Sequence, residues 1–101
     1  MTDTTFSLVG KTVVVTGGGR GVGRGISHAM ARAGANVIIA GRSMAPMEST
    51  AAECRKIMTE GNGGGQIVIT PTDITKMSDI QHLVDDTVRR FGYIEIGRAH
   101  V

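Results

Sequence analysis

The feature that most constrains the fold is a regular alternation of short apolar runs with segments of helical periodicity. Apolar runs of strand length occur at 12–16 (TVVVT), 36–40 (NVIIA) and 66–70 (QIVIT). Each run is continuous rather than alternating, as is typical of strands that are buried on both faces of a sheet. The pattern therefore predicts an α/β fold of order β-α-β-α-β-α, the N-terminal half of a doubly wound parallel sheet.

Three segments between and after these runs carry apolar residues at helical spacing. Gly34 and Gly92 are expected to end the first and third helices in the left-handed conformation. Ser43 is expected to cap the second helix, with Pro46 in its first turn. The glycine density of 61–65 (GNGGG) predicts a loop. The predicted buried stripes are Ile26, Ala29, Met30 and Ala33; Met47, Ala51, Cys54 and Met58; and Ile80, Leu83, Val84, Val88 and Phe91.

Composition excludes several classes of function. A chain of 101 residues with a net charge of +2 and three aromatic residues offers neither a dense basic patch nor a base-stacking platform for nucleic acid. Cys54 is the only cysteine, and the three histidines lack metal-ligand spacing. The apolar runs are too short to span a membrane, and the first ten residues do not resemble a secretory signal. We therefore expect a cytoplasmic protein without membrane or nucleic-acid partners.

The chemistry is concentrated where the first predicted strand meets the first predicted helix, at 16–23 (TGGGRGVG). Free backbone N–H groups and the positive end of a helix favour an anion there, and glycines allow close approach. The Gly-x-Gly-x-x-Gly fingerprint is not matched in any register, and a phosphate-binding Walker loop fails because Arg24-Gly25 replaces Lys-Ser/Thr. The pattern Thr-Gly-x-x-x-Gly-x-Gly does fit. The alternative is a glycine-rich turn that holds no ligand.

Together with 38–42 (IIAGR) and 72–75 (TDIT), this turn resembles the N-terminal part of the short-chain dehydrogenase/reductase family. The three motifs occur in the family's order, and the resemblance runs from Leu8 to about Ile94. It implies an NAD(P)-binding Rossmann domain. The backbone of the glycine motif would then cradle the pyrophosphate and the adenosine ribose, through Gly17, Gly19, Gly21, Val22 and Gly23.

The residues after the second predicted strand indicate which coenzyme is bound. Gly41 stands where an acidic residue would bind both ribose hydroxyls and repel a 2′-phosphate. Arg42 follows directly, with Ser43 beside it, and Arg20 lies in the glycine turn; guanidinium groups suit a phosphate dianion. We therefore predict NADP(H), with NAD(H) as the alternative. The alternative interpretation is that both arginines are only solvated cations of the loops.

The segment after the third predicted strand completes the expected site. Asp73 resembles the family aspartate that accepts a hydrogen bond from the adenine amino group, with Ile74 beside the ring. Asp73 is also a candidate N-cap for the third helix, and the two roles are compatible. No catalytic or metal-binding residue is predicted. The predicted coenzyme-binding residues are Gly17, Gly19, Arg20, Gly21, Val22, Gly23, Arg42, Ser43, Asp73 and Ile74.

The family's catalytic serine and its tyrosine–lysine pair are not in this sequence, because Tyr93 is the only tyrosine and Gly97 stands four residues later. We expect residues 1–94 to be a truncated coenzyme-binding domain. Residues 95–101 are expected to be non-native, because one back-translation of Ile96–Val101 matches a common sequencing adapter. The expected function is the inactive coenzyme-binding part of an NADP(H)-dependent, homo-oligomeric oxidoreductase acting on a carbonyl or alcohol. The alternative is a non-catalytic dinucleotide-binding module.

Overall fold

The computed structural model describes residues 8–17, 21–61 and 65–92, and it confirms the expected alternation of strands and helices. Three strand boundaries differ by one residue from those predicted, since the second strand extends to Gly41 and the third runs from Ile67 to Pro71. The elements are β1 (Thr12–Thr16), α1 (Gly21–Arg32), β2 (Asn36–Gly41), α2 (Met44–Glu60), β3 (Ile67–Pro71) and α3 (Met77–Phe91).

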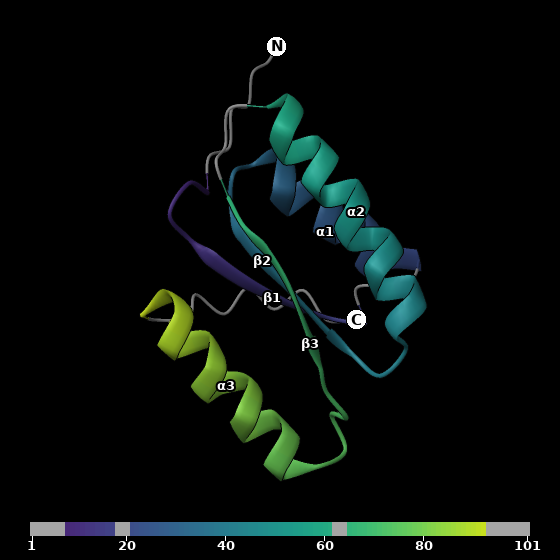
Figure 1. Cartoon of the computed structure of the whole chain (residues 1–101), viewed down its shortest axis with the longest axis vertical. Helices are drawn as coiled ribbons and strands as arrows, with labels where there is room; N and C mark the ends of the chain where they lie inside the picture. Colours follow the sequence, from purple (N-terminus) through teal and green to yellow (C-terminus); the bar gives the residue numbers. More distant parts are fainter. Residues whose placement is uncertain (1–7, 18–20, 62–64, 93–101) are drawn as a thin grey trace.

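The three strands form one parallel sheet in the order β1-β2-β3, so β2 is central. The register pairs Val13 of β1 with Val37 of β2, and Val37 in turn with Ile67 of β3. Helices α1 and α2 cover one face of the sheet and α3 covers the other (Figure 1). Because all three strands run in the same direction, their carboxyl ends meet at one edge.

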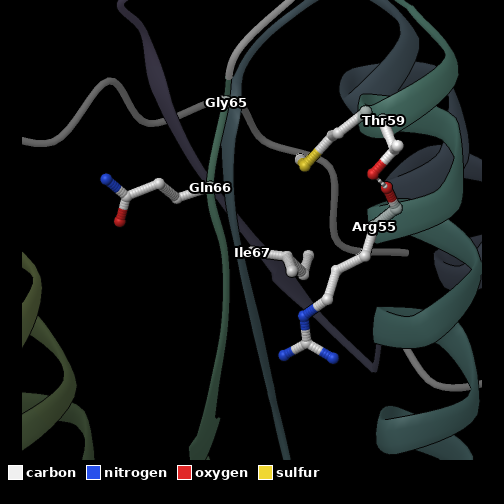
Figure 2. Close-up of a pocket in the computed structure, with 6 residues that line it drawn as sticks. Arg55, Thr59, Gly65, Gln66 and Ile67 are labelled. Atoms are coloured by element: carbon white, nitrogen blue, oxygen red, sulfur yellow. Dashed lines mark hydrogen bonds between the residues drawn. The ribbon is translucent and has the colours of Figure 1, made fainter.

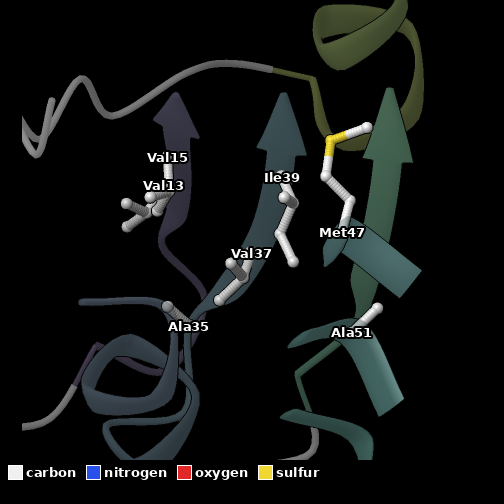
Figure 3. Packing of buried hydrophobic residues seen from close by; sticks show 7 residues of the cluster. All are labelled: Val13, Val15, Ala35, Val37, Ile39, Met47 and Ala51. Atoms are coloured by element: carbon white, nitrogen blue, oxygen red, sulfur yellow. The ribbon is translucent and has the colours of Figure 1, made fainter. Parts of the chain in front are cut away.

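The main core lies between the sheet and helices α1 and α2 (Figure 3). Alternate residues of β1 and β2 point to this face, and Met47 and Ala51 of α2 pack against them. The intervening strand residues, including Ile38 and Ala40, face α3 and form a second cluster with Leu83. Burying such aliphatic side chains contributes about 1.5–3 kcal/mol each to the free energy of unfolding. The main core consists of Val13, Val15, Ala35, Val37, Ile39, Met47 and Ala51.

The stripe predicted for α2 is confirmed for Met47, Ala51 and Cys54, which are buried, whereas Met58 is half-buried at the edge of the same core. The stripe predicted for α1 is partly wrong, because Ala29 is exposed and Ser27 is buried. The Ser27 hydroxyl donates a hydrogen bond to the Gly23 carbonyl oxygen at 2.9 Å. This bond removes the cost of burying the hydroxyl, so a small polar residue is accommodated inside.

The apolar stripe predicted for α3 is also only partly buried. Leu83 packs onto the sheet, whereas Val84 and Val88 are 37% and 43% exposed. Thr87 is buried in their place, with its hydroxyl donating to the Leu83 carbonyl oxygen at 2.7 Å. A helix on one face of a sheet buries a narrow stripe, and the remaining apolar residues stay at its margin.

The predicted helix ends agree with the structure at both glycines. Gly34 and Gly92 have positive φ angles of 90° and 83°. Ser43 occupies the N-cap position of α2, but its side chain makes no capping hydrogen bond. The centre of the predicted 61–65 loop, Tyr93 and the predicted non-native tail lie outside the described residues. None of the helices in the described ranges has the length and apolar character needed to cross a membrane.

Candidate functional site

The carboxyl edge of the sheet brings together the three segments that the sequence motifs identified. The Gly17 N–H, just after β1, donates to the Ala40 carbonyl oxygen of β2 at 2.9 Å. The Thr72 N–H, just after β3, donates to the Gly41 carbonyl oxygen at 2.7 Å. These two bonds extend the ladder beyond the strands and hold the three loops side by side. Ligands of open parallel sheets bind outside this edge.

The glycine turn after β1 has the backbone conformation that its sequence requires. Gly17 and Gly21 have positive φ angles of 68° and 50°, a region that other residues rarely adopt. A Cβ atom built on either glycine meets no atom of the protein within 4 Å, so both face open space. The predicted site residues Gly19 and Arg20 lie outside the described residues.

Helix α1 begins at Gly21, so its N-terminus points to this open space. The first N–H groups of a helix have no partner within the helix, and the helix dipole places partial positive charge there. The first turn of α1 contains no acidic residue that would compensate this charge. Val22, in the same turn, is 62% exposed. The turn therefore fits an anion with an apolar group beside it, as the pyrophosphate and adenosine of a dinucleotide provide.

The loop after β2 carries a cation and no carboxylate. Gly41 leaves little room, since a Cβ built there lies 3.3 Å from the Met47 sulfur. The Arg42 side chain is 75% exposed. Ser43 is exposed as well. A guanidinium and a hydroxyl thus stand at the end of the central strand, where an anion of the ligand would be recognised.

Asp73, after β3, is not the N-cap of α3, and that prediction was wrong. The N-cap residue is Lys76. The Asp73 Oδ1 atom instead accepts hydrogen bonds from the Thr75 N–H at 3.0 Å and the Thr75 hydroxyl at 2.6 Å, which makes an Asx turn between β3 and α3. The turn occupies residues that the prediction had given to the helix, so α3 starts later.

The surroundings of Asp73 keep its carboxylate ionised. The Thr75 hydroxyl, the Thr75 N–H and the nearby Arg42 charge lower the pKa of Asp73. The Asp73 N–H donates to Asp79 Oδ2 at 2.8 Å, which ties this loop to the first turn of α3. Ile74, beside it, is 58% exposed. The loop therefore presents a fixed anion next to an exposed apolar side chain.

An ion pair joins the second and third loops, with Arg42 Nη1 3.8 Å from Asp73 Oδ2. This contact was not predicted from the sequence, and neither were the roles of Thr75 and Asp79. The Asp-x-Thr spacing is a local signal that would have found the Thr75 turn. No local signal marks the contacts with Arg42 and Asp79, because they depend on how the loops meet.

In the described part of the chain, neither Cys54 nor a metal-binding cluster forms a second site. Cys54 is buried, and this burial raises the pKa of its thiol to about 11, so the reactive thiolate form is suppressed at neutral pH. Within residues 8–17, 21–61 and 65–92, no three His, Cys, Asp or Glu side chains are grouped so as to hold a metal ion.

A shallow pocket lies at the opposite, amino edge of the sheet (Figure 2). It is formed where the last turns of α2 pass the start of β3. Ile67 points toward α2 and Gln66 points away from it, as expected for successive residues of an extended chain (Figure 2). The pocket is therefore separate from the carboxyl-edge loops. Its lining residues are Arg55, Met58, Thr59, Gly65, Gln66 and Ile67.

Comparison with known proteins gives a consistent result. A family model described as short chain dehydrogenase matches residues 11–96. A short chain dehydrogenase/reductase of Colletotrichum higginsianum is 38% identical over 89 residues, which are 88% of this chain and 31% of that protein. The L-fucose dehydrogenase of Bos taurus is 37% identical over 86 residues, which are 85% of this chain and 28% of that protein. The chain thus spans about a third of the length of these relatives.

Solved structures resemble this chain over a similar stretch. A citronellol catabolism dehydrogenase of Pseudomonas aeruginosa superposes with a TM-score of 0.76 at 32% identity, over 91% of this chain and 36% of that one. A hydroxysteroid dehydrogenase of Escherichia coli gives a TM-score of 0.79 at 27% identity, over 91% of this chain and 37% of that one. The observed β-α-β-α-β-α unit corresponds to about a third of each of these chains.

Proposed function

Because this chain belongs to the short chain dehydrogenase family, we propose that it is the coenzyme-binding part of an NADP(H)-dependent oxidoreductase acting on a carbonyl or alcohol. The observation that carries the proposal is the composition of the carboxyl edge. A left-handed glycine turn opens α1 without a neighbouring acid, and an exposed arginine follows β2 where a carboxylate would exclude a 2′-phosphate. The coenzyme, when bound, supplies or accepts a hydride at its nicotinamide ring.

The N-terminus of α1 is assigned to the pyrophosphate. The left-handed Gly17 and Gly21 turn the chain so that the backbone comes close to the ligand without an intervening Cβ atom. The N–H groups at the start of α1 then point at the phosphate oxygens, and the helix dipole favours their charge. Gly19, Arg20 and Gly23 are assigned to the same turn from the sequence pattern.

The loop after β2 is assigned to the adenosine ribose and its 2′-phosphate. Arg42 and Ser43 supply donors suited to a phosphate, and Gly41 contributes no negative charge. An acidic residue at position 41 would reverse this preference by binding the ribose hydroxyls. NAD(H) is the alternative coenzyme, because the pyrophosphate and adenine contacts do not depend on the 2′-phosphate.

The loop after β3 is assigned to the adenine. Thr75 saturates Asp73 Oδ1, which leaves Oδ2 as the acceptor for the adenine amino group. Ile74, from this loop, and Val22, from the first turn of α1, are exposed apolar residues that would lie against the ring. Both coenzymes share the adenine, so these contacts contribute affinity without discriminating between them.

A second candidate is a non-catalytic dinucleotide-binding module. It is favoured by the carboxyl-edge loops, whose described residues are all assigned to binding the dinucleotide and none to a reaction. The coding sequence that follows in the source DNA decides between the two. A serine and a Tyr-x-x-x-Lys motif downstream would establish the oxidoreductase, and their absence from the complete coding sequence would establish the module.

The coenzyme assignment is tested by Arg42→Ala in the full-length protein, with NADPH and NADH titrated separately. Hydrogen bonds to charged groups are worth about 1.5–3 kcal/mol, so we expect NADPH to bind about ten- to a hundredfold more weakly and NADH to be nearly unaffected. Arg55→Ala removes an exposed arginine at the opposite edge of the sheet and serves as the matched control, with both dissociation constants unchanged. Equal losses for the two coenzymes in Arg42→Ala would refute the assignment.

A further inference from the structure

The ion pair between the second and third loops bears on how strictly the coenzyme is chosen. We infer that Asp73 is a specificity-determining residue, whose carboxylate competes with the coenzyme's 2′-phosphate for the Arg42 guanidinium. The inference rests on the proposed function, since it concerns the adenosine end of the same site. It assigns to Asp73 an effect that opposes NADPH binding, in addition to its proposed contact with the adenine.

The geometry makes Asp73 the fixed partner of this pair and Arg42 the adaptable one. Thr75 donates two hydrogen bonds to Asp73 Oδ1, and the Asp73 N–H is bound to Asp79. The Asp73 side chain is only 16% exposed, whereas that of Arg42 is 75% exposed. The oxygen that Thr75 leaves free, Oδ2, is the atom 3.8 Å from Arg42 Nη1. The carboxylate is thus held in place, oriented toward the guanidinium.

The charges around this point limit the attraction for an additional anion. The loop after β2 contributes Arg42, and the turn between β3 and α3 contributes Asp73, Lys76 and Asp79. The Arg42 charge is therefore already balanced by a neighbouring carboxylate. A phosphate dianion that binds Arg42 must draw the guanidinium away from Asp73 and accept the repulsion of the same carboxylate.

The energetic cost of separating Arg42 from Asp73 weakens the binding of only one of the two coenzymes. NADPH brings the 2′-phosphate and so disturbs the pair, whereas NADH lacks this group and leaves Arg42 beside Asp73. The adenine contact proposed for Asp73 is common to both coenzymes and cancels when the two dissociation constants are compared. The ratio of the NADH dissociation constant to the NADPH dissociation constant therefore isolates the effect of the Arg42–Asp73 ion pair.

The test is Asp73→Asn in the full-length protein, with NADPH and NADH titrated by calorimetry. Asparagine is nearly isosteric and keeps an oxygen for the two Thr75 donors, so the Asx turn is retained while the atom facing Arg42 becomes an uncharged amide nitrogen. Exposed ion pairs are worth about 0.2–1 kcal/mol, so we expect the ratio of NADH to NADPH dissociation constants to rise about 1.4- to fivefold. An unchanged or lower ratio would overturn the inference.

Two further variants separate the pair from a general effect of charge. Asp79→Asn removes a carboxylate from the same turn but one without a contact to Arg42, and it keeps an oxygen for the Asp73 N–H, so we expect it to raise the ratio less than Asp73→Asn does. In an Arg42→Gln background, Asp73→Asn should raise the ratio by less than it does with Arg42 present, because only the repulsion between the Asp73 carboxylate and the phosphate remains. An equal rise in Asp79→Asn, or an equal rise in the Arg42→Gln background, would refute the competition.

The Arg42→Gln variant also distinguishes this inference from the proposed function. A selective loss of NADPH binding in Arg42→Gln supports the proposed function whatever the outcome for Asp73→Asn. Equal losses of both coenzymes would refute the coenzyme assignment and the inference together.

Discussion

Replacing Gly65 with alanine tests how closely the start of β3 packs on the turn that follows α1. A Cβ atom built on Gly65 would lie 2.2 Å from the Ala35 carbonyl oxygen, where ordinary contact begins at 3.4 Å. The obstacle is backbone rather than a flexible side chain. The Val37 N–H donates to the Gln66 carbonyl oxygen at 2.8 Å, and the Gln66 N–H donates to Asn36 Oδ1 at 3.0 Å, so the two segments are held together on both sides.

Relieving the overlap requires these segments to separate by about 1 Å, which loosens the pairing of β2 with β3. Forcing extra atoms into a packed interior costs about 1–3 kcal/mol of the free energy of unfolding. In proteins of about 150–250 residues a cost of this size lowers Tm by about 2–12 °C, and the greater length of the relatives places a full-length protein at the lower end of that range. The coenzyme loops lie at the opposite edge of the sheet, so NADPH affinity of the folded variant should be unchanged.

Thermal and urea unfolding of Gly65→Ala measure the effect, with Gly25→Ala as the matched control. Gly25 is exposed within α1, and a Cβ built there meets nothing within 4 Å. The control should therefore gain about 0.5–1 kcal/mol, because alanine favours the helix. A Gly65→Ala variant as stable as the wild type would show that the two backbones do not constrain each other.

Two other predictions concern the coenzyme preference and acid stability. Gly41→Asp should shift the coenzyme preference toward NADH about tenfold or more relative to Gly41→Ala, which makes the same contact with Met47 but adds no charge. Titration of both coenzymes into the two variants measures this shift. Equal ratios of the NADH and NADPH dissociation constants in the two variants would contradict the prediction. Hydrogen bonds from Arg24 and His28 of α1 lower the pKa of Glu53 on α2 below its usual value of 4.5. Ionised Glu53 therefore stabilises the folded state above that pH, and this contribution is lost as the pH falls through the lowered pKa. In urea unfolding across pH 3–7, Glu53→Gln should therefore flatten the decline at the acid end, and an unaltered slope would refute this role.

The order of the elements could be predicted from the sequence, because it depends on local chemistry. A continuous β-branched run such as 12–16 favours a doubly buried strand, and Gly34 and Gly92 end helices because the chain needs a left-handed residue there. The glycine pattern likewise placed the candidate coenzyme turn between β1 and α1. Each of these features is set within a few residues of the chain, so no tertiary information was required.

Which residues of each helix are buried was decided only by tertiary packing. The periodicity of α1 placed Ala29 inside, but the sheet covers Ser27, whose hydroxyl is satisfied by its own helix. In α3 the periodicity did not separate Leu83 from Val84, although one is buried and the other is partly exposed. Adjacent apolar positions look alike along the chain, and the neighbouring element determines which of them loses contact with water.

The residues that could recognise the coenzyme were visible in the sequence, but their interactions were not. Arg42 and Asp73 each follow a strand, and their positions alone identified them as site residues. The turn that Asp73 forms with Thr75 follows from the local Asp-x-Thr spacing, whereas the approach of its free oxygen to Arg42 depends on how β2 and β3 pair. The sequence determined which charged residues lie at the carboxyl edge of the sheet. The tertiary structure decided which of these charges are close enough to interact, because Coulomb energy depends on distance in space and not along the chain.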